Sequence, residues 1–243
     1  MLKFTRQVSS DELVVVFLNT ATRHNQRYFR ALGLERRNCV RVFDPSGCQS
    51  LAGMRPEFLD FASVLARLRE IVSTVQPRRL LVCGASTSGF PALLYGSLLQ
   101  ADDVIAIAPY TSFAPGEMCL PEAEKKVWAK RVRLLLFKFP DFPEAYLDLG
   151  KVLAEGNGKT RYAIHVGGGC ERDVVDAGRL AGLPGVRIHT HPYQYHSLDQ
   201  YLLMSGQLRA VHCPGYEVPS GVRKRVARLR AGLSFRWQRM RIA

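Results

Sequence analysis

The chain has 243 residues, 47% of them hydrophobic, which fits one α/β domain with one good core. It carries 34 Lys and Arg against 21 Asp and Glu, a formal net charge of +13. No run of about 18 apolar residues occurs, which excludes a membrane-spanning helix. The N-terminal residues lack a secretory signal, and the six cysteines contain no Cys-x-x-Cys pair. We therefore expect a reduced, cytoplasmic protein without a zinc site.

Short runs rich in Val, Ile and Leu alternate with amphipathic stretches along most of the chain. Strands are predicted at Leu2–Gln7, Leu13–Leu18, Cys39–Phe43, Leu80–Cys83, Val104–Ala108, Tyr162–Val166 and Val186–His191. Helices are predicted at Phe58–Val75, Gly89–Leu99, Glu122–Phe137, Phe142–Ala154, Asp173–Leu180 and Ser197–Val211. This alternation predicts an α/β fold with a mostly parallel central sheet and helices on both faces.

The segment 115–158 interrupts the alternation with helices only. It predicts a helical cap over the carboxyl edge of the sheet, where open α/β sheets bind their ligands. Its helix Glu122–Phe137 either lies on the domain as an ordinary amphipathic helix or forms a mobile lid with an apolar face. No repeat or low-complexity linker divides the chain, so we expect one domain over residues 1–214 and a basic tail over 215–243.

A serine stands at the apex of a sharp predicted turn. The apolar run Leu80–Cys83 ends in Gly84-Ala85-Ser86-Thr87-Ser88-Gly89, and a helix follows. A strand that turns abruptly into a helix at a serine is the nucleophile elbow of serine acyl-transfer enzymes. The apex backbone is strained, so the positions two before and two after it should be small. Gly84 and Ser88 meet that demand, although glycine is the more usual residue at the position of Ser88.

An acid and a histidine follow in a characteristic order. Asp173 comes after the predicted strand Tyr162–Val166, and His196 comes after the last strand, so the chain order is Ser…Asp…His. Two alternatives stay open for the acid. Asp173 could instead serve as the N-cap of the following helix. Asp176 competes for the acid role, although it lies about one turn further into that helix.

These motifs and their order resemble the α/β-hydrolase fold family over roughly residues 12–212. More narrowly, the chain is similar to small bacterial α/β-hydrolase-like proteins that often accompany surface-polysaccharide assembly. Their elbow reads Gly-x-Ser-x-Gly-Gly. The stretch from Asp44 to Ser50 is also similar to the Asp-x-x-Gly-x-x-Ser turn that many of these folds carry after an early strand.

The resemblance implies a role for each of these residues. Ser86 would attack an acyl carbonyl, His196 would take its proton, and Asp173 would orient the imidazole. The backbone N–H groups of Thr87 and Thr20 would form the oxyanion hole. The activity implied is hydrolysis or transfer of an ester, thioester or sugar O-acyl group, on a small-molecule or glycan substrate and with no cofactor.

Two departures keep other functions open. Ser88 replaces a glycine, and the common His-Gly oxyanion motif is absent from Asn19–Arg23. The rival hypothesis is a non-catalytic hydrolase-like scaffold in a cell-envelope or polysaccharide assembly complex. A minor alternative is an NAD(P)-binding protein similar to short-chain dehydrogenases, because their glycine-rich turn resembles Gly84–Gly89. That turn should follow the first strand, however, and no Tyr-x-x-x-Lys occurs.

The remaining signals concern metals and partners. His189 and His191 share a strand face, but no third ligand accompanies them at credible spacing, so no metal site is predicted. The tail Gly221–Ala243 has eight cations and no acid around an apolar stripe at helical spacing. Such a segment can bind an anionic membrane surface at the inner face of the membrane, dock on a protein partner, or pack on its own domain. No recognised nucleic-acid motif is present.

Overall fold

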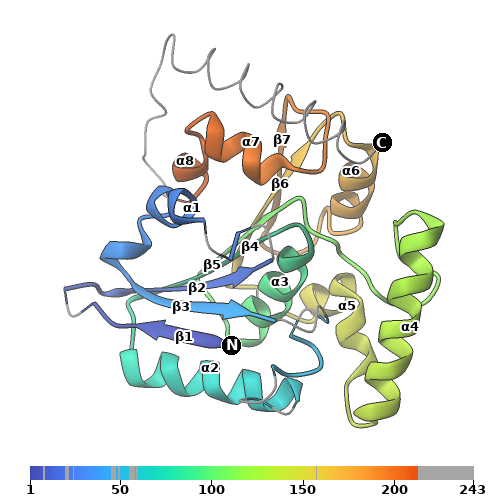
Figure 1. The fold of residues 1–243 in the computed structure, drawn as a ribbon, viewed down its shortest axis with the longest axis horizontal. Coiled ribbons are helices and arrows are strands. Elements are labelled where there is room, and N and C mark those ends of the chain that lie inside the picture. Colours follow the sequence, from blue (N-terminus) through green and yellow to red (C-terminus); the bar gives the residue numbers. More distant parts are fainter. Residues whose placement is uncertain are drawn as a thin grey trace.

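The centre of the fold is a seven-stranded sheet with the order β1-β3-β2-β4-β5-β6-β7 (Figure 1). The computed structural model describes residues 1–7, 9–19, 22–23, 25–44, 48, 50–54, 58, 60–156 and 158–212, so the tail 215–243 lies outside the described residues. The strands are β1 (Leu2–Thr5), β2 (Glu12–Leu18), β3 (Asn38–Phe43), β4 (Arg79–Ala85), β5 (Asp103–Ile107), β6 (Arg161–Gly167) and β7 (Val186–His191).

Six of the strands are parallel, and β1 alone among the described strands runs antiparallel, along β3. The register places Val15 of β2 opposite Val40 of β3 and Val82 of β4. All three valines are fully buried. Strands covered on both faces need such continuous apolar runs, and the parallel ladder is the arrangement in which they occur.

Helices cover both faces of the sheet. They are α1 (Gln26–Ala31), α2 (Phe61–Val75), α3 (Gly89–Leu98), α4 (Glu122–Lys138), α5 (Leu149–Ala154), α6 (Glu171–Gly178), α7 (Leu198–Met204) and α8 (Leu208–His212), with short 3-10 turns η1 (Leu34–Arg36), η2 (Ser86–Ser88) and η3 (Glu144–Leu147). Helices α1, α7 and α8 contribute to one apolar core. The second core, on the other face, includes buried residues of α2, α3, α4 and α5. The predicted mostly parallel sheet with helices on both faces is confirmed.

Between β5 and β6 the described chain forms only helices, namely α4, η3 and α5. Helix α4 joins the core through Trp128, whose ring stacks on Phe113 with centroids 4.1 Å apart. In Figure 1 α4 stands at the outer edge of the molecule, beyond α5. Nowhere in the described ranges is a helix both long enough and apolar enough to cross a lipid bilayer.

Two predicted helices are each broken into two. The segment Phe142–Ala154 forms η3 and then α5, because the Asp148 side chain accepts a hydrogen bond from Gly150 N at 2.9 Å and caps the second helix. The segment Ser197–Val211 forms α7 and α8, and Gly206 between them has φ of 72°. The short helix α1 was not predicted.

Helix α2 begins three residues later than the predicted start at Phe58. Asp60 is its N-cap and accepts from Ser63 N at 2.7 Å, while Asp60 N donates to the Ser63 hydroxyl at 3.2 Å. This reciprocal pair satisfies two N–H groups at the helix start, and it fixes where the helix begins.

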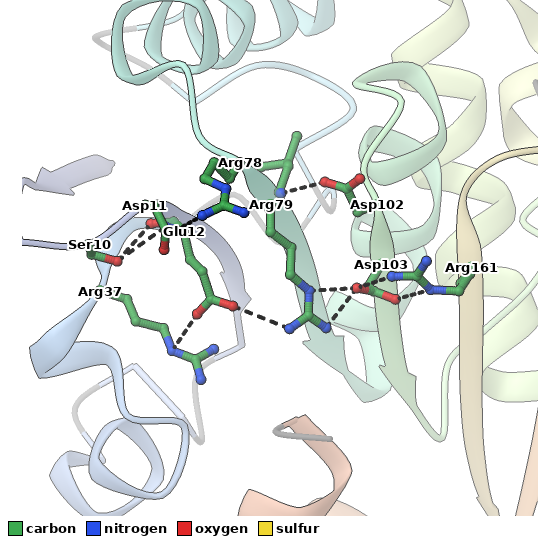
Figure 2. Close-up of polar contacts among 10 residues, drawn as sticks. Ser10, Asp11, Glu12, Arg37, Arg78, Arg79, Asp102, Asp103 and Arg161 are labelled. Carbon is green, nitrogen blue, oxygen red and sulfur yellow. Dashed lines mark hydrogen bonds and ion pairs between the residues drawn. The ribbon is translucent and has the colours of Figure 1, made fainter. Parts of the chain in front are cut away.

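Charged side chains meet where β2, β4, β5 and β6 begin (Figure 2). Arg79 lies between Glu12 and Asp103, at 3.2 Å and 2.7 Å. Arg161 approaches the other oxygen of Asp103 at 2.7 Å, and Arg37 lies 3.2 Å from Glu12. The chain Arg37–Glu12–Arg79–Asp103–Arg161 thus ties neighbouring strands together at the amino edge of the sheet, and we call it the amino-edge ion-pair chain.

Candidate active site

Ser86 lies at the carboxyl end of the central strand β4, in the sharp turn that leads into α3. Its φ is 54°, a left-handed conformation that a residue with a side chain adopts only under constraint. The constraint comes from the flanking strand and helix, because Ala85 is still extended and Gly89 is already helical. The side chain is thereby pushed out at the edge of the sheet.

Two glycines let the turn close. A Cβ on Gly84 would collide with the Ser88 carbonyl oxygen, and one on Gly89 would lie 2.7 Å from Cβ of Pro109. Ser88 itself is 3% exposed with ordinary helical dihedrals, φ −79° and ψ −9°. A small residue other than glycine therefore fits at the position of Ser88. The close backbone approach after Ser86 falls one residue later, at Gly89.

The structure brings Ser86, His196 and Asp173 together. The Ser86 hydroxyl oxygen is 2.6 Å from Nε2 of His196. Nδ1 of the same ring is 2.7 Å from Oδ1 of Asp173. Ser86 follows β4, Asp173 is in the first turn of α6 after β6, and His196 lies between β7 and α7. Three segments far apart in the sequence therefore meet at the carboxyl edge of one sheet.

The proton positions follow from the partners. An ionised Asp173 only accepts hydrogen bonds, so His196 Nδ1–H donates to it and Nε2 is left to accept from the Ser86 hydroxyl. Asp173 is 1% exposed, and burial opposes its ionisation. The hydrogen bonds from His196 and Cys170, together with the Arg172 charge, outweigh burial and hold its pKa below the usual value. The arrangement can move a proton off the hydroxyl and keep the resulting imidazolium paired.

The competing acid has a different environment. Asp176, on the same helix as Asp173, accepts from the Thr111 hydroxyl at 2.9 Å and is 2% exposed. Burial raises its pKa to about 6, despite the hydrogen bonds from Thr111. Asp173 therefore holds the position beside the imidazole, and Asp176 serves to anchor α6 to the chain after β5.

Glycines allow the loop after β6 and the loop after β7 to lie in close contact. A Cβ on Gly167 would lie 2.7 Å from the Tyr193 carbonyl oxygen, and one on Gly169 would lie 2.9 Å from Cα of Gln194. Gly169 N also donates to the Tyr193 carbonyl at 3.0 Å. The loop after β6 carries Asp173 and the loop after β7 carries His196, so this contact fixes the distance between acid and imidazole. The run of three glycines was the sequence signal for it.

An aromatic stack was missed by the sequence analysis. The Tyr110 ring, just after β5, stacks on the His196 ring at 5.7 Å with an angle of 7° between the planes. The Arg172 guanidinium lies 5.3 Å from the same Tyr110 ring. The phenol face thus limits rotation of the imidazole, and Arg172 keeps the tyrosine in place. A lone Tyr after a strand gives no sequence signal for this role.

One predicted oxyanion donor can be placed and the other cannot. Thr87 follows Ser86 in the first turn of the helical segment, where backbone N–H groups have no helical acceptor. It borders a hollow of about 60 Å³ that is also lined by Asn19. Thr20 lies outside the described residues. The Asn19 side chain accepts from Thr22 N at 3.0 Å and donates to the Ala85 carbonyl at 3.3 Å, so it ties the turn after β2 to the elbow.

The histidine pair of β7 has a third neighbour that was not predicted. His165 Nδ1 is 3.0 Å from His191 Nε2, and its ring stacks on His189 at 4.6 Å. Burial, followed by the charges of these neighbours, lowers the pKa of His165 to about 2. Within the described part of the chain no group of three His, Cys, Asp or Glu residues is arranged to hold a metal ion.

Three solved structures share this architecture. Carboxyl esterase 2 of Tuber melanosporum matches with a TM-score of 0.56 and 15% identity, over 88% of this chain and 80% of that one. The capsule O-acetyltransferase of Neisseria meningitidis serogroup A matches with a TM-score of 0.54 and 14% identity, over 78% of this chain and 80% of that one. The chain has the α/β-hydrolase fold. At these identities the likeness shows the fold and no more.

A further α/β-hydrolase-fold match is the glycosylation-associated Gap123 complex of Streptococcus agalactiae, with a TM-score of 0.55 and 13% identity. That match covers 78% of this chain but only 39% of that chain. No protein-family model matches the sequence, and no curated protein matches it. Ligands bind at the carboxyl edge of open α/β sheets. In this chain that edge carries the turn after β4 with Ser86, the loop after β6 with Asp173 and the loop after β7 with His196.

Proposed function

We propose that this protein is a serine esterase or acyltransferase that works through an acyl-enzyme on Ser86, with His196 as general base and acid and Asp173 as its partner. The observation that carries the proposal is the unbroken line of two short contacts, 2.6 Å from Ser86 to His196 and 2.7 Å from His196 to Asp173. A nucleophile bonded to a base that a third group orients is the general arrangement for covalent acyl transfer.

In the first step the Ser86 oxygen attacks the acyl carbonyl while His196 Nε2 takes the hydroxyl proton. The negative charge that develops on the carbonyl oxygen is stabilised by the Thr87 backbone N–H and by a second donor after β2, for which Thr20 is our candidate. His196 then returns the proton to the leaving group. The acyl-enzyme and the free alcohol or thiol are the products of this step.

In the second step His196 activates an acceptor that attacks the acyl-enzyme. With water the protein is an esterase or thioesterase, and with a sugar hydroxyl it is an O-acyltransferase. The folds of an esterase and of a capsule O-acetyltransferase fit both outcomes, so a small-molecule or glycan acyl substrate is proposed without choosing the acceptor. We further propose one catalytic domain over residues 1–214 with the segment 115–158 as its cap, in the cytoplasm.

The test is labelling with a fluorophosphonate probe, which requires an activated serine. Wild-type protein should be labelled, and the mass of the adduct should fall on the tryptic peptide that holds Ser86. Ser86→Ala should abolish labelling and lower kcat on an activated ester by about 10⁶-fold. Ser97→Ala, which removes a serine near the C-terminal end of α3, is the matched control and should label normally.

A scaffold without catalysis is the second candidate. It is favoured by the match to a chain of the Gap123 complex, 39% of which is covered. Folded wild-type protein that stays unlabelled by the probe would contradict the enzyme proposal and support the scaffold.

A further inference from the structure

Helix α4 has two apolar faces. Its inner face buries Trp128, Val132 and Leu135 against the core. Its outer face carries Val127, Leu134 and Phe137, which are 51%, 56% and 86% exposed. An ordinary surface helix has one apolar stripe and a polar opposite side. The core therefore does not account for Val127, Leu134 and Phe137.

The outer residues form a line along the helix. Positions 123, 127, 130, 134 and 137 follow a spacing of four and three residues, which places them on one side of a helix. Apart from Lys130 they are Ala, Val, Leu and Phe. Single exposed apolar residues need no explanation, but an aligned set marks a contact surface. We call this set the outer stripe of α4.

Cations predominate around the outer stripe. From Lys125 to Lys138 the helix holds six cations and no acid. Lys126, Lys130, Arg133 and Lys138 are exposed, on both sides of the stripe and within it. The two glutamates of α4, Glu122 and Glu124, are in its first turn on either side of Ala123, and Glu122 pairs with Lys125 at 2.9 Å. From Val127 onward the surface is thus apolar along its middle and cationic along its margins.

An open cavity of about 670 Å³ lies beside the outer stripe. Leu134 and Phe137 line it together with Phe139, and Arg131 and Lys138 border it. Most of its lining is apolar side chain. Because Leu134 and Phe137 belong to both features, anything seated on the outer stripe also meets the mouth of this cavity.

This combination favours a lipid surface over other occupants. A soluble polyanion would use the cations and gain nothing from an exposed Phe and Leu. The basic tail 215–243 of the chain itself carries cations, as the outer stripe does, so their charges repel. A bilayer with anionic headgroups offers an apolar interior for Val127, Leu134 and Phe137 and negative charge for the lysines and arginines, whose stems reach up to the headgroups.

We propose that the outer stripe of α4 docks this protein on an anionic lipid surface, with the helix lying in the plane of the headgroups. The docking is separate from the acyl-transfer chemistry and does not depend on it. It is independent of the tail, for which a membrane surface was one of three alternatives, and it places the 670 Å³ cavity at the membrane surface.

The experiment is co-sedimentation of the full chain with vesicles of phosphatidylcholine alone or mixed with phosphatidylglycerol. Wild-type protein should sediment with the anionic vesicles and much less with the neutral ones, and salt should release it. The double substitution Leu134→Gln and Phe137→Gln should lower the partition coefficient about tenfold or more. Ile188→Gln, which removes a 36% exposed apolar residue on β7, is the matched control and should bind like wild type.

The charge contribution has its own pair of variants. Lys130→Gln with Arg133→Gln should weaken binding about tenfold, whereas Arg27→Gln with Arg30→Gln, an equal loss of charge on exposed residues of α1, should weaken it much less. Melting curves confirm that each variant is folded. The proposal is overturned if wild type ignores anionic vesicles or if the Leu134 and Phe137 variant still binds fully. It is also overturned if that variant instead converts a wild-type dimer to monomer, since a second copy would then cover the stripe.

Discussion

The two ends of the sheet are built on opposite principles. At the amino edge, acids and arginines alternate in the amino-edge ion-pair chain, and Asp103 accepts from two guanidinium groups. At the carboxyl edge, a serine is held at φ of 54° and an imidazole reaches it from another loop. The charged groups of the amino edge are paired with one another. At the carboxyl edge, the backbone of Ser86 is held in a conformation that residues with a side chain rarely adopt.

The same strands serve both ends. β4 begins with Arg79 and runs into Ser86, and β6 begins with Arg161 and leads to Asp173. A strand fixed at its start by ion pairs cannot slip in register, so the side chains at its end keep their relative positions. The ion pairs and the proposed catalytic groups thus lie at opposite ends of the same strands, and substitutions at the two ends should have separate effects.

The largest effect is expected at the carboxyl edge. Asp173→Asn should lower kcat by about 10⁴-fold, because an amide that donates to Nδ1 favours the tautomer in which Nε2 carries the proton. The midpoint of unfolding should change little by comparison. The check is ester hydrolysis with labelling kinetics, alongside urea unfolding. Full activity in this variant would remove Asp173 from the mechanism.

The reverse pattern is expected at the amino edge. Asp103→Asn should lower the free energy of unfolding by about 1–2 kcal/mol and leave activity intact, because Arg79 and Arg161, themselves 28% and 67% exposed, lose a 13% exposed partner. Asp11→Asn, in an exposed pair with Arg78, should cost under about 0.5 kcal/mol. Urea unfolding at pH 7 measures both.

The loss of stability at low pH offers a second test of this ion-pair explanation. Burial opposes ionisation of Asp103, but the hydrogen bonds and charges of Arg161 and Arg79 hold its pKa below the usual value. The stabilisation is therefore present above about pH 4 and is lost as the pH falls through the lower pKa of the folded state. The difference between wild type and Asp103→Asn should shrink in acid, and a constant difference would contradict the ion-pair explanation.

Asp176 should behave oppositely to Asp103. Burial raises its pKa to about 6, so folding favours the protonated acid. Its favourable contribution is complete below about pH 4 and is lost as the pH rises through about 6. Asp176→Asn should then be more stable than wild type by up to about 2 kcal/mol at pH 8, with the gap closing near pH 4. Thermal unfolding across this range is the measurement, and a variant that is less stable at pH 8 would contradict it.

The smallest effect is expected at Ser88. Ser88→Gly should lower the free energy of unfolding by about 0.5–1 kcal/mol through added backbone freedom, with activity unchanged. Gly89→Ala, one residue on, should reduce activity strongly because its Cβ would lie 2.7 Å from Pro109. Comparing kcat and melting temperature of the two variants tests whether position 89, and not position 88, requires a glycine. A gain of activity in Ser88→Gly would show that the serine impairs the turn.

Sequence reasoning reached the architecture and the three residues that meet at the site, because each has a local signal. The valine-rich runs mark buried parallel strands, and the order of Ser86, Asp173 and His196 follows the strand order. What it missed depends on contacts between distant segments. The stack of Tyr110 on His196 joins the end of β5 to a loop after β7, and the hydrogen bond from Thr111 to Asp176 joins the chain after β5 to α6.

Local capping also escaped sequence reasoning in part. The breaks at Asp148 and Gly206 could not be separated from continuous helices, because the apolar spacing continues across both. The two apolar faces of α4 could not be predicted from the sequence for a related reason. Its sequence has apolar residues all round, and only the packing shows which of them, such as Trp128 and Phe137, face inward and outward.

The strand that leads to His196 is the least covered in the sheet. Every residue of β7 is partly or fully exposed, whereas every residue of β4 after the first is buried. Segments with few buried neighbours open at lower free energy than the core. As the temperature rises, the segment that carries His196 should therefore open before the segment that carries Ser86. We expect the catalytic rate to fall at temperatures where the circular dichroism signal of the sheet is still unchanged.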